Sequence, residues 1–290
     1  MNVMVTGATG FIGTHLLRCL SKKHHVVALA RSLKQPEEDG VVWVRRDLAN
    51  TDEKLEVAEQ IDAVVCLAQA REYRDFPQNV WSMFNVNVKA MLVLLEYARQ
   101  ANVKKFVLLS SANVYKRSHL RLLESAPLEP DSFYARSKQM AEMLLESYAM
   151  FFNCIVLRLF TVYGPTQRGM IVQSLVERVR EGRAIEVQGK RGLLLSPIYV
   201  SDACSVIQIV LESHDFGTGF HVFNVGGDET VDLCQLGRMI GSILNKTPRL
   251  EFRHGEEPEG WIADTTKLKK TFNVGPFVPV EQGLRHVIHG

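Results

Sequence analysis

The sequence predicts an α/β fold in which a doubly wound parallel sheet is joined to a smaller C-terminal lobe. Up to about residue 160, short β-branched runs alternate with longer segments of helical period, which is the pattern of repeated βαβ units. Beyond that point the alternation loosens, and Gly, Pro and Arg become more frequent. We therefore expect a first domain at 1–160, with elements near 195–225 returning to it, and a lobe formed mainly by 161–290.

Each element is predicted from its hydrophobic period and from the residues that flank it. Within the helix expected after residue 80, for example, Leu92, Leu95 and Ala98 alternate with polar side chains and indicate a half-buried face. Strands are expected near 2–5, 25–30, 41–45, 62–67, 105–110, 154–160, 184–188 and 221–225. Helices are expected near 11–22, 80–101, 133–151, 168–180, 201–213 and 231–245.

The composition of the 290 residues is that of an ordinary globular protein, 46% hydrophobic and 23% charged. The 34 Lys and Arg residues nearly balance the 32 Asp and Glu residues, for a net charge of +2. So weak an overall field argues against a nucleic acid or an anionic membrane as partner. Any recognition of charge must be local.

The cysteines and the apolar runs exclude two further classes of protein. The five cysteines are far apart and form no C-x-x-C pair, so neither a disulfide framework nor a zinc site is expected. The nine histidines lack neighbouring ligands of metal-binding spacing, and we predict no metal. The chain opens without a signal-peptide pattern, and no apolar run approaches the roughly 20 residues of a membrane span. We expect a cytoplasmic protein.

The first thirteen residues predict a dinucleotide-binding turn of the Rossmann type. A short strand leads into glycines at 7, 10 and 13, and a helix is expected to open at the last of them. The first glycine permits the tight turn, the second lets a pyrophosphate approach the backbone, and the third allows close packing of helix and strand. The phosphates would lie at the positive end of the helix. The predicted contacts are Gly7, Thr9, Gly10, Phe11, Ile12 and Gly13.

The end of the second strand predicts which dinucleotide is bound. Val26–Ala30 is followed by Arg31, and no carboxylate is present there. Asp or Glu usually meets the free ribose hydroxyl of NAD(H), whereas a guanidinium attracts the 2′-phosphate of NADP(H). We therefore favour NADP(H) and keep NAD(H) as possible. The alternative interpretation of Arg31 is a solvated side chain at a strand end.

Asp47 and Leu48 follow the third strand and are further candidate cofactor contacts. The Asp47 carboxylate suits the amino group of an adenine. An Asp in a turn also commonly caps the segment that follows it, and the sequence leaves both interpretations open.

Tyr134 and Lys138 are the strongest candidates for chemistry. Their spacing of four places the phenol and the ammonium on one face of a helix. Next to a cation and a positively charged nicotinamide, a phenol with an ordinary pKa of roughly 10 is expected to ionise more easily and to act as acid or base. Ser110 and Ser111 follow the apolar strand at 106–109, and a hydroxyl at that end of a parallel strand faces the cofactor site.

The order of these motifs resembles the extended short-chain dehydrogenase/reductase family, which contains nucleotide-sugar epimerases, dehydratases and ketoreductases. The resemblance spans almost the whole chain. The matching positions are Thr6–Gly13, Asp47–Leu48, Leu67–Ala68, Asn87, Ser110–Tyr115, Tyr134 with Lys138, Leu157–Arg158, Tyr163–Pro165, Tyr199–Asp202, Phe223–Gly226, Asp264–Thr265 and Gly283–Leu284.

The resemblance implies a role for each residue of the site. Tyr134 would donate or accept the proton, Lys138 would lower its pKa and bind the nicotinamide ribose, and Ser111 would hydrogen-bond the reacting oxygen. Asn87 would help to hold the cofactor loop, and a structural role is the alternative. The residues implied along the pyrophosphate and ribose are Leu67, Ala68 and Gln69, and the C-terminal lobe is the one that would bind substrate.

Departures from the family pattern argue against a dehydratase and do not identify the nucleotide of the substrate. Dehydratases carry an Asp-Glu pair after the catalytic hydroxyl residue, whereas this chain has Ala112 and Asn113. Many UDP-sugar epimerases carry Asn and Arg where this chain has Thr161 and Leu195. Cations elsewhere in the chain would replace the missing diphosphate contacts. The alternative is that these cations are solvated surface charges. The candidate substrate contacts are Asn113, Thr161, Arg168 and Arg191, with Lys190 as a further candidate cation.

We predict an NADP(H)-dependent oxidoreductase that reduces the 4-keto group of a nucleotide-linked sugar. The alternative is an NAD(P)-dependent nucleotide-sugar epimerase. A dinucleotide sensor without catalysis is disfavoured, because Ser111, Tyr134 and Lys138 occur together. Analogy with the family also implies a homodimer formed by the helices near 80–101 and 133–151.

Overall fold

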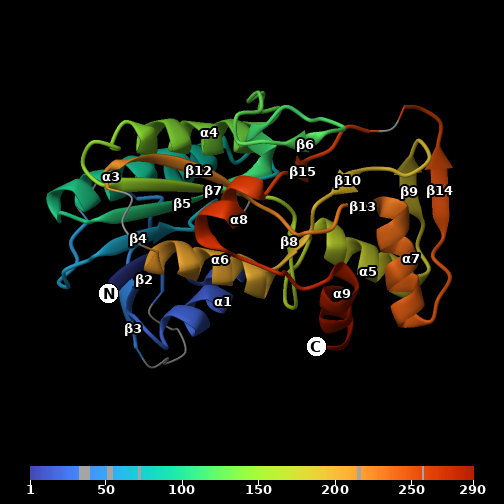
Figure 1. Ribbon diagram of the computed structural model, residues 1–290, viewed down its shortest axis with the longest axis horizontal. Helices are drawn as coiled ribbons and strands as arrows, with labels where there is room; N and C mark the ends of the chain where they lie inside the picture. Colours follow the sequence, from blue (N-terminus) through green and yellow to red (C-terminus); the bar gives the residue numbers. More distant parts are fainter. Residues whose placement is uncertain (33–39, 51–54, 71–72, 214–216, 257) are drawn as a thin grey trace. The chain divides into compact units, whose positions relative to one another are not determined.

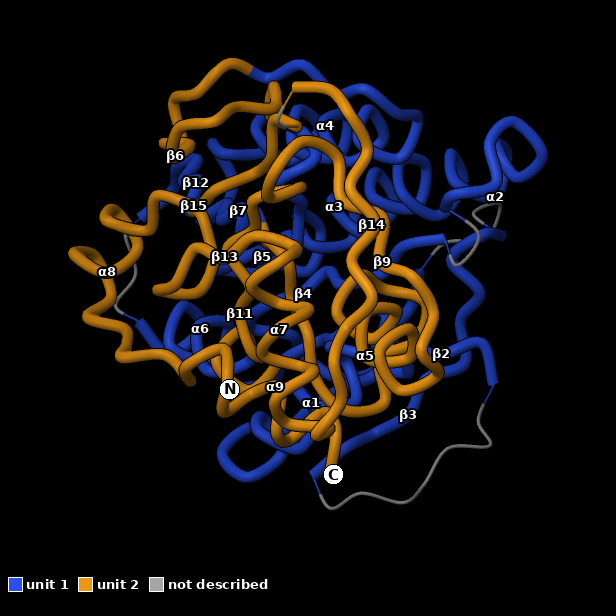
Figure 2. The backbone as a smooth tube through the Cα atoms, turned by 90° about the vertical axis from the view of Figure 1, so that its right-hand side faces the viewer, with its two compact units in different colours: residues 1–114, 128–158, 204–223 blue, residues 115–127, 159–203, 224–290 orange. Residues whose placement is uncertain are grey.

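The computed structural model describes the chain except residues 33–39, 51–54, 71–72, 214–216 and 257. It divides into two compact units (Figure 2). Unit 1 comprises residues 1–114, 128–158 and 204–223, and unit 2 comprises residues 115–127, 159–203 and 224–290. The return of the chain to the first unit was expected, near 195–225.

One segment belongs to a different unit from the one that its sequence position indicates. Residues 115–127 lie in unit 2, because their partners come from the far end of the chain. The Tyr115 hydroxyl lies 2.7 Å from Oδ1 of Asn224, and Ser118 exchanges backbone hydrogen bonds with Gly260. Such pairings between distant residues leave no periodic signal in the sequence.

Unit 1 contains a seven-stranded sheet; the sequence predicts a parallel sheet without its number of strands. The strand order is β12-β7-β5-β4-β1-β2-β3, and β3, β2, β1, β4 and β5 run parallel to their neighbours in this series. The bounds are β1 Asn2–Thr6, β2 His25–Ala30, β3 Val41–Arg45, β4 Ala63–Cys66, β5 Lys105–Ser111, β7 Asn153–Leu159 and β12 Gly219–Val225.

Helices cover both faces of this sheet, with α3 and α4 on one face and α1 and α6 on the other (Figure 1). The sheet is therefore doubly wound, which confirms the predicted fold class. The single helix expected at 80–101 is divided into α2, a π-helical turn η1 and α3. The bounds are α1 Phe11–Leu20, α2 Val80–Phe84, η1 Asn85–Lys89, α3 Ala90–Gln100, the short η2 Ala112–Val114, α4 Phe133–Glu146 and α6 Val200–Glu212.

One apolar core cluster of unit 1 lies between the sheet and the pair α3 and α4. Every residue of β5 is buried, as expected for a central strand of a parallel sheet covered on both faces. Its apolar side chains, such as Phe106, pack with Leu95 of α3 and Leu145 of α4. The strand is thus fixed along its length, and so are the residues at its carboxyl end.

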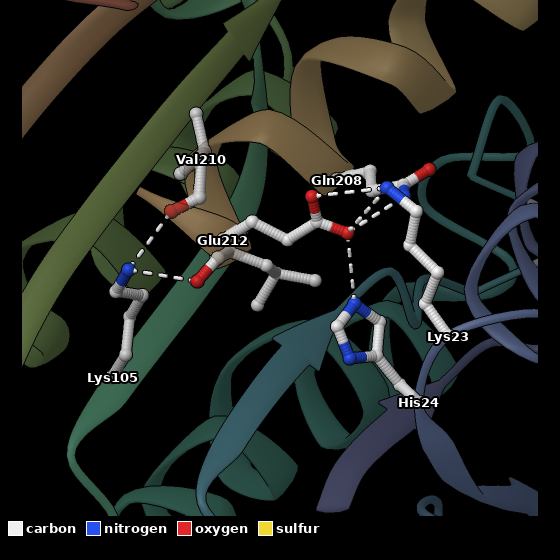
Figure 3. Close-up of polar contacts among 7 residues, drawn as sticks. Lys23, His24, Lys105, Gln208, Val210 and Glu212 are labelled. Atoms are coloured by element: carbon white, nitrogen blue, oxygen red, sulfur yellow. Dashed lines mark hydrogen bonds and ion pairs between the residues drawn. The ribbon is translucent and has the colours of Figure 1, made fainter. Parts of the chain in front are cut away.

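The first residue of β5 is a buried lysine that caps the end of α6 (Figure 3). Lys105 Nζ donates hydrogen bonds to the backbone carbonyls of Val210, Leu211 and Ser213 at 2.9, 3.0 and 3.1 Å. The last carbonyls of a helix lack intrahelical partners and carry the negative end of its dipole, so an ammonium satisfies both.

Unit 2 is built from short elements around its own apolar cluster. Helices α5 and α7 contribute Val176, Leu236 and Ile240 to this cluster. Four two-stranded sheets accompany them: β9–β14, β8–β11 and β6–β15 are parallel, and β10–β13 is antiparallel. The bounds are β6 Arg121–Leu122, β8 Val162–Tyr163, α5 Ile171–Glu181, β9 Ile185–Gln188, β10 Leu194–Leu195, β11 Ile198–Tyr199, β13 Val231–Asp232, α7 Leu233–Leu244, β14 Leu250–Arg253, β15 Ile262–Ala263, α8 Thr266–Phe272 and α9 Val280–His289.

The described residues were also searched for disulfides, metal sites and membrane-spanning helices, which the composition disfavours. All five cysteines are free thiols. Across the described ranges, no three His, Cys, Asp or Glu side chains group closely enough to hold a metal ion. In that same part of the chain, none of the helices is long and apolar enough to span a membrane.

Candidate active site

The glycine turn between β1 and α1 has the geometry of a phosphate cradle. Gly7 has a φ of +68°, and a Cβ there would lie 2.8 Å from the backbone nitrogen of Ala68. A Cβ on Gly13 would lie 2.3 Å from the carbonyl oxygen of Gly7. Neither position tolerates a side chain, so the backbone stays accessible for close approach of a ligand.

The start of α1 provides the hydrogen-bond donors for such a ligand. The helix begins at Phe11, the first residue of the expected range 11–22 and two residues before the last glycine of the turn, with Gly10 as its N-cap. Within the described chain no side chain caps it, so N–H groups of the first turn remain for an anion. Thr9 and Ile12 flank this point. The residues therefore fit the pyrophosphate of a dinucleotide.

The loop after β4 closes the other side of the cradle. Thr6 Oγ1 accepts a hydrogen bond from the backbone N–H of Ala68 at 3.2 Å and lies 3.6 Å from Sγ of Cys66. The Thr6 carbonyl accepts from the N–H of Leu67 at 3.3 Å. Strand β1 thus fixes Leu67 and Ala68 next to the glycine turn, where the resemblance implies cofactor contacts.

The two adenosine-side candidates are exposed. Arg31 directly follows β2, where it is open to solvent, and this position fits either interpretation of that residue. The carboxylate of Asp47 accepts a hydrogen bond from the backbone N–H of Ala49 at 3.0 Å, which is the turn-capping role. Leu48 is half-buried and packs against the core of unit 1.

Ser111, Tyr134 and Lys138 lie together at the carboxyl end of β5. Tyr134 and Lys138 come from the first turns of α4, which starts after the N-cap Ser132 accepts a hydrogen bond from Ala135 N–H. Ser111 lies near the phenol of Tyr134, where its hydroxyl favours the ionised form of the phenol. The Tyr134 hydroxyl also lies 3.4 Å from Oε1 of Gln69, a long contact.

The Lys138 ammonium is buried and donates to the carbonyl oxygen of Leu109 at 3.0 Å. Burial lowers its pKa, while Cys66 and Glu142 act in the opposite direction. Lys138 is not among the groups that lower the pKa of Tyr134 here, and its role toward the phenol stays a prediction. Desolvation dominates, and the ammonium is directed to a backbone carbonyl.

Burial raises the pKa of Tyr134 to about 12, and nearby Tyr73 adds to the rise. The hydrogen bond from Ser111 and the charge of Arg74 lower the pKa, but by less. The ring of Tyr73 lies 4.6 Å from that of Tyr134, centroid to centroid. The phenol is consequently protonated at neutral pH until a further positive charge arrives.

Asn87 connects the cofactor loop to the catalytic helix. In its buried position, Oδ1 accepts from Ala70 N–H at 2.9 Å and Nδ2 donates to the Ser137 hydroxyl at 2.9 Å. Ser137 in turn donates to the carbonyl oxygen of Tyr134 at 2.7 Å. This side chain thus has a structural role, since it joins the loop after β4 to α4. Its part in holding a cofactor stays a prediction.

The candidate substrate residues fall in both units. Asn113, in unit 1, accepts from the Ser111 hydroxyl at 3.1 Å through Oδ1 and donates its backbone N–H back at 3.2 Å. In unit 2, the carbonyl of Thr161 accepts from Ile198 N–H at 2.9 Å, and Arg168 and Arg191 are exposed. Their substrate contacts stay a prediction.

Sequence analysis did not assign a role to three residues beside the catalytic group, namely Ser110, Glu142 and Arg158. They form a buried cluster in which Arg158 Nη2 lies 2.7 Å from Glu142 Oε2 and the Ser110 hydroxyl donates to Glu142. Two signals were available. Glu142 continues the spacing of four from Tyr134 and Lys138, and Arg158 is a charge inside an apolar strand.

Comparison with known proteins identifies similar chains of the same length. A model of the NAD dependent epimerase/dehydratase family matches residues 3–226. The UDP-glucuronate 4-epimerase of Thermodesulfobacterium geofontis is 26% identical, over 99% of this chain and 94% of that protein. A protein of Bacillus subtilis described as an uncharacterized UDP-glucose epimerase is 28% identical, over 99% and 97%.

Solved structures show the same relationship. The UDP-glucuronic acid 4-epimerase of Bacillus cereus, in complex with UDP-glucuronic acid and NAD, has a TM-score of 0.87 and 27% identity, over 99% of this chain and 98% of that one. MoeE5 with UDP-glucuronic acid and NAD gives the same values. These findings confirm the resemblance to extended short-chain dehydrogenases/reductases. They favour the predicted alternative, an epimerase, over a 4-keto reductase, and they do not support the preference for NADP(H).

Proposed function

Because the chain belongs to the NAD dependent epimerase/dehydratase family, we propose that it is a nucleotide-sugar 4-epimerase that uses NAD. The observation that carries this proposal is the meeting of Ser111, Tyr134 and Lys138 at the carboxyl end of β5, in the same unit as the glycine cradle. The earlier preference for NADP(H) depended on Arg31 alone. That side chain is exposed, whereas similar solved structures carry NAD.

NAD, when bound, supplies an acceptor for a hydride and returns it. Tyr134 Oη takes the hydroxyl proton of the sugar carbon being oxidised and gives it back to the ketone oxygen in the second half of the reaction. The Ser111 hydroxyl is placed to hydrogen-bond that oxygen as its charge changes. Since burial raises the pKa of Tyr134 to about 12, the phenol needs a nearby positive charge to ionise, and oxidised nicotinamide carries one.

The residues next to Ser111 argue against elimination of water from the sugar. Elimination of water would need an acid and a base on the sugar, and the two following positions hold Ala112 and Asn113. Asn113 instead hydrogen-bonds Ser111 and fixes its hydroxyl. In the proposed reaction, the keto sugar is therefore reduced from its other face and is not dehydrated.

We propose a UDP-linked hexuronic acid as the first substrate to be tested. The relatives that support this choice are UDP-glucuronic acid epimerases. Exposed guanidinium groups of unit 2, those of Arg168 and Arg191, are candidate partners of the anionic diphosphate. UDP-glucose is the second substrate of choice, because the Bacillus subtilis relative is described by that sugar.

Nuclear magnetic resonance of the sugar tests the proposal directly. Purified protein is incubated with UDP-glucuronic acid or UDP-glucose and catalytic NAD, and the 4-epimer is expected to appear without net reduction of NAD. Stoichiometric consumption of NADPH with a 4-keto-sugar nucleotide, and no epimer from any UDP-sugar, would establish the reductase instead.

We also propose that the protein is a homodimer assembled through α2, α3 and α4. These helices leave large apolar side chains exposed, with Trp81 at 74% and Met143 at 61% of full exposure. Such a surface favours contact with another chain. Light scattering is expected to give twice the chain mass, and Trp81→Glu is expected to give monomers. A monomeric native protein would contradict the proposal. The cytoplasmic location stays a prediction.

A further inference from the structure

The cluster of Ser110, Glu142 and Arg158 lies beside the catalytic residues in unit 1 but touches none of the reacting groups. All three side chains are buried, Glu142 and Arg158 with 5% of each side chain exposed. Arg158 Nε lies 3.1 Å from Glu142 Oε1, and Nη2 lies 2.7 Å from Oε2. The guanidinium thus holds the carboxylate in a two-point contact, which fixes direction as well as distance.

The cluster adds to the contacts between β5 and α4, where three residues one turn apart on α4 lie against three successive residues at the end of β5. Lys138 donates to the Leu109 carbonyl, and Glu142 accepts a hydrogen bond from the Ser110 hydroxyl. Tyr134 lies near Ser111, whose hydroxyl favours the ionised form of its phenol. The contacts of Lys138 and Tyr134 belong to the proposed catalytic group. The contact between Glu142 and Ser110 has a further partner, because Arg158 of β7 binds Glu142.

The energetic cost of such a pair argues against a role in stability alone. Removing two charges from water costs several kcal/mol per ion, roughly what their attraction returns, and apolar replacements are often neutral. What a buried two-point pair adds is one defined geometry. Here that geometry sets the position of α4 along β5, and with it the Ser111–Tyr134 contact.

The cluster also influences the electrostatic field at the Lys138 ammonium. The groups that face its ammonium are the Leu109 carbonyl from β5, the Cys66 thiol from β4 and the Glu142 carboxylate one turn along α4. Glu142 is the carboxylate among them, and Arg158 balances part of its charge. Moving Glu142 would therefore alter the field at Lys138 as well as the helix position.

We propose that Glu142, held by Arg158, is a positioning residue that locks α4 to the end of β5 through Ser110, so that Tyr134 and Lys138 meet the reacting sugar and the nicotinamide ribose. The inference rests on the proposed epimerase function for its kinetic readout. The proposed position of α4 against β5 depends only on contacts within this chain and does not need the epimerase function.

The test replaces the pair and keeps its volume. Glu142→Gln alone would leave a buried guanidinium unpaired and risks unfolding, so the principal variant is Glu142→Met with Arg158→Met. The double variant is expected to melt near the wild-type temperature. Its kcat for epimerisation is expected to fall about 100-fold, because a displacement of about 1 Å at the reacting atoms costs that much. The KM for the UDP-sugar is expected to change less than about threefold.

A milder variant and matched controls separate position from general damage. Ser110→Ala removes the hydroxyl contact and is expected to lower kcat about tenfold. Ser147→Ala removes a hydroxyl near the other end of α4, where it donates to Met143, and is expected to leave kcat unchanged. Lys105→Met removes a buried charge at the far end of β5, and the folded protein is expected to keep its kcat.

Calorimetric titration with NAD supplies a readout that needs no turnover. If Lys138 shifts with α4, the Kd for NAD is expected to rise several-fold in the double variant and to stay at the wild-type value in Lys105→Met. A double variant with wild-type kcat and wild-type NAD affinity would overturn the positioning role. Wild-type protein that epimerises no UDP-sugar would overturn the proposed function, while the NAD titrations would still decide the positioning role.

Discussion

The two ends of β5 use buried polar groups for opposite purposes. At the amino end, Lys105 donates to the terminal carbonyls of α6, and every donor meets a fixed backbone acceptor (Figure 3). At the carboxyl end, Ser111 lies near Tyr134, whose phenol would gain and lose a proton in the proposed reaction. A parallel sheet brings the carboxyl ends of its strands to one edge, where ligands bind, and leaves the other edge for anchoring. We infer that one end supports stability and the other supports chemistry.

The largest effect is expected from a substitution at the carboxyl end of β5. Tyr134→Phe removes the group that carries the proton, and kcat is expected to fall by about 10³-fold or more. Binding of NAD is expected to persist, because the glycine cradle is untouched. Epimerisation assays and NAD titration on the same sample check both statements. Turnover near the wild-type rate would assign the proton transfer to another group.

Ser111→Ala tests the same end through a smaller change. The variant loses a hydrogen-bond donor to the reacting oxygen and a partner of the Tyr134 phenol, so kcat is expected to fall about 10²-fold. Loss of the Ser111 bond also removes a contribution that lowers the pKa of Tyr134. The alkaline shift of the pH profile of kcat that follows is the second measurement. An unchanged profile would remove Ser111 from the ionisation of the phenol.

Lys105→Met perturbs the amino end and is expected to show the reverse pattern. The end of α6 would lose three charged hydrogen bonds in a buried setting, and the free energy of unfolding is expected to drop by about 2 kcal/mol or more. Urea unfolding measures this loss. Assays well below the melting temperature are expected to give wild-type kcat. A variant that is stable but slow would contradict the division between the two ends.

The smallest effect concerns Glu212, at the end of the helix that Lys105 caps (Figure 3). Hydrogen bonds, first from Gln208 and then from His24 and Lys23, hold the pKa of this carboxyl below its ordinary 4.5. A carboxyl with a lowered pKa contributes stability above its ordinary pKa, and this contribution is lost as pH falls through the folded value. The group is partly exposed, so the effect is expected to stay below about 1 kcal/mol.

Melting temperatures measured from about pH 6 to pH 3 test this contribution. Glu212→Gln is expected to flatten the acid decline slightly, while kcat at neutral pH is expected to remain that of wild type. Curves of equal steepness for the two proteins would show that the carboxyl adds nothing measurable at this end of the strand.

Most of the fold and the centre of the site could be predicted from the sequence. The strands at 25–30 and 41–45 agree with the structure residue for residue, because each is a short run rich in valine with clear limits. Ser111, Tyr134 and Lys138 were also predicted, and the structure brings them together. The division of the helix at 80–100 by a π-helical turn was not predicted, because its residues keep a helical period throughout.

The electrostatic state of the site was predicted less well. Spacing alone placed Lys138 next to Tyr134 and suggested an acidic phenol. The structure shows instead that burial raises the pKa of Tyr134 and that the ammonium turns to Leu109. Desolvation depends on everything that surrounds a group, and a one-dimensional pattern contains none of that information.

The sequence by itself determined the alternation of strands and helices, the glycines that only a tight turn accommodates, and the pairing of a phenol with an amine one helical turn apart. These are local properties, set by backbone sterics and side-chain period. Only the tertiary structure decided that residues 115–127 leave the first unit, and that Glu142 and Arg158 meet beside the catalytic helix. Those outcomes depend on contacts between residues distant in the chain, whose partners are selected by packing and by the need to pair buried charge.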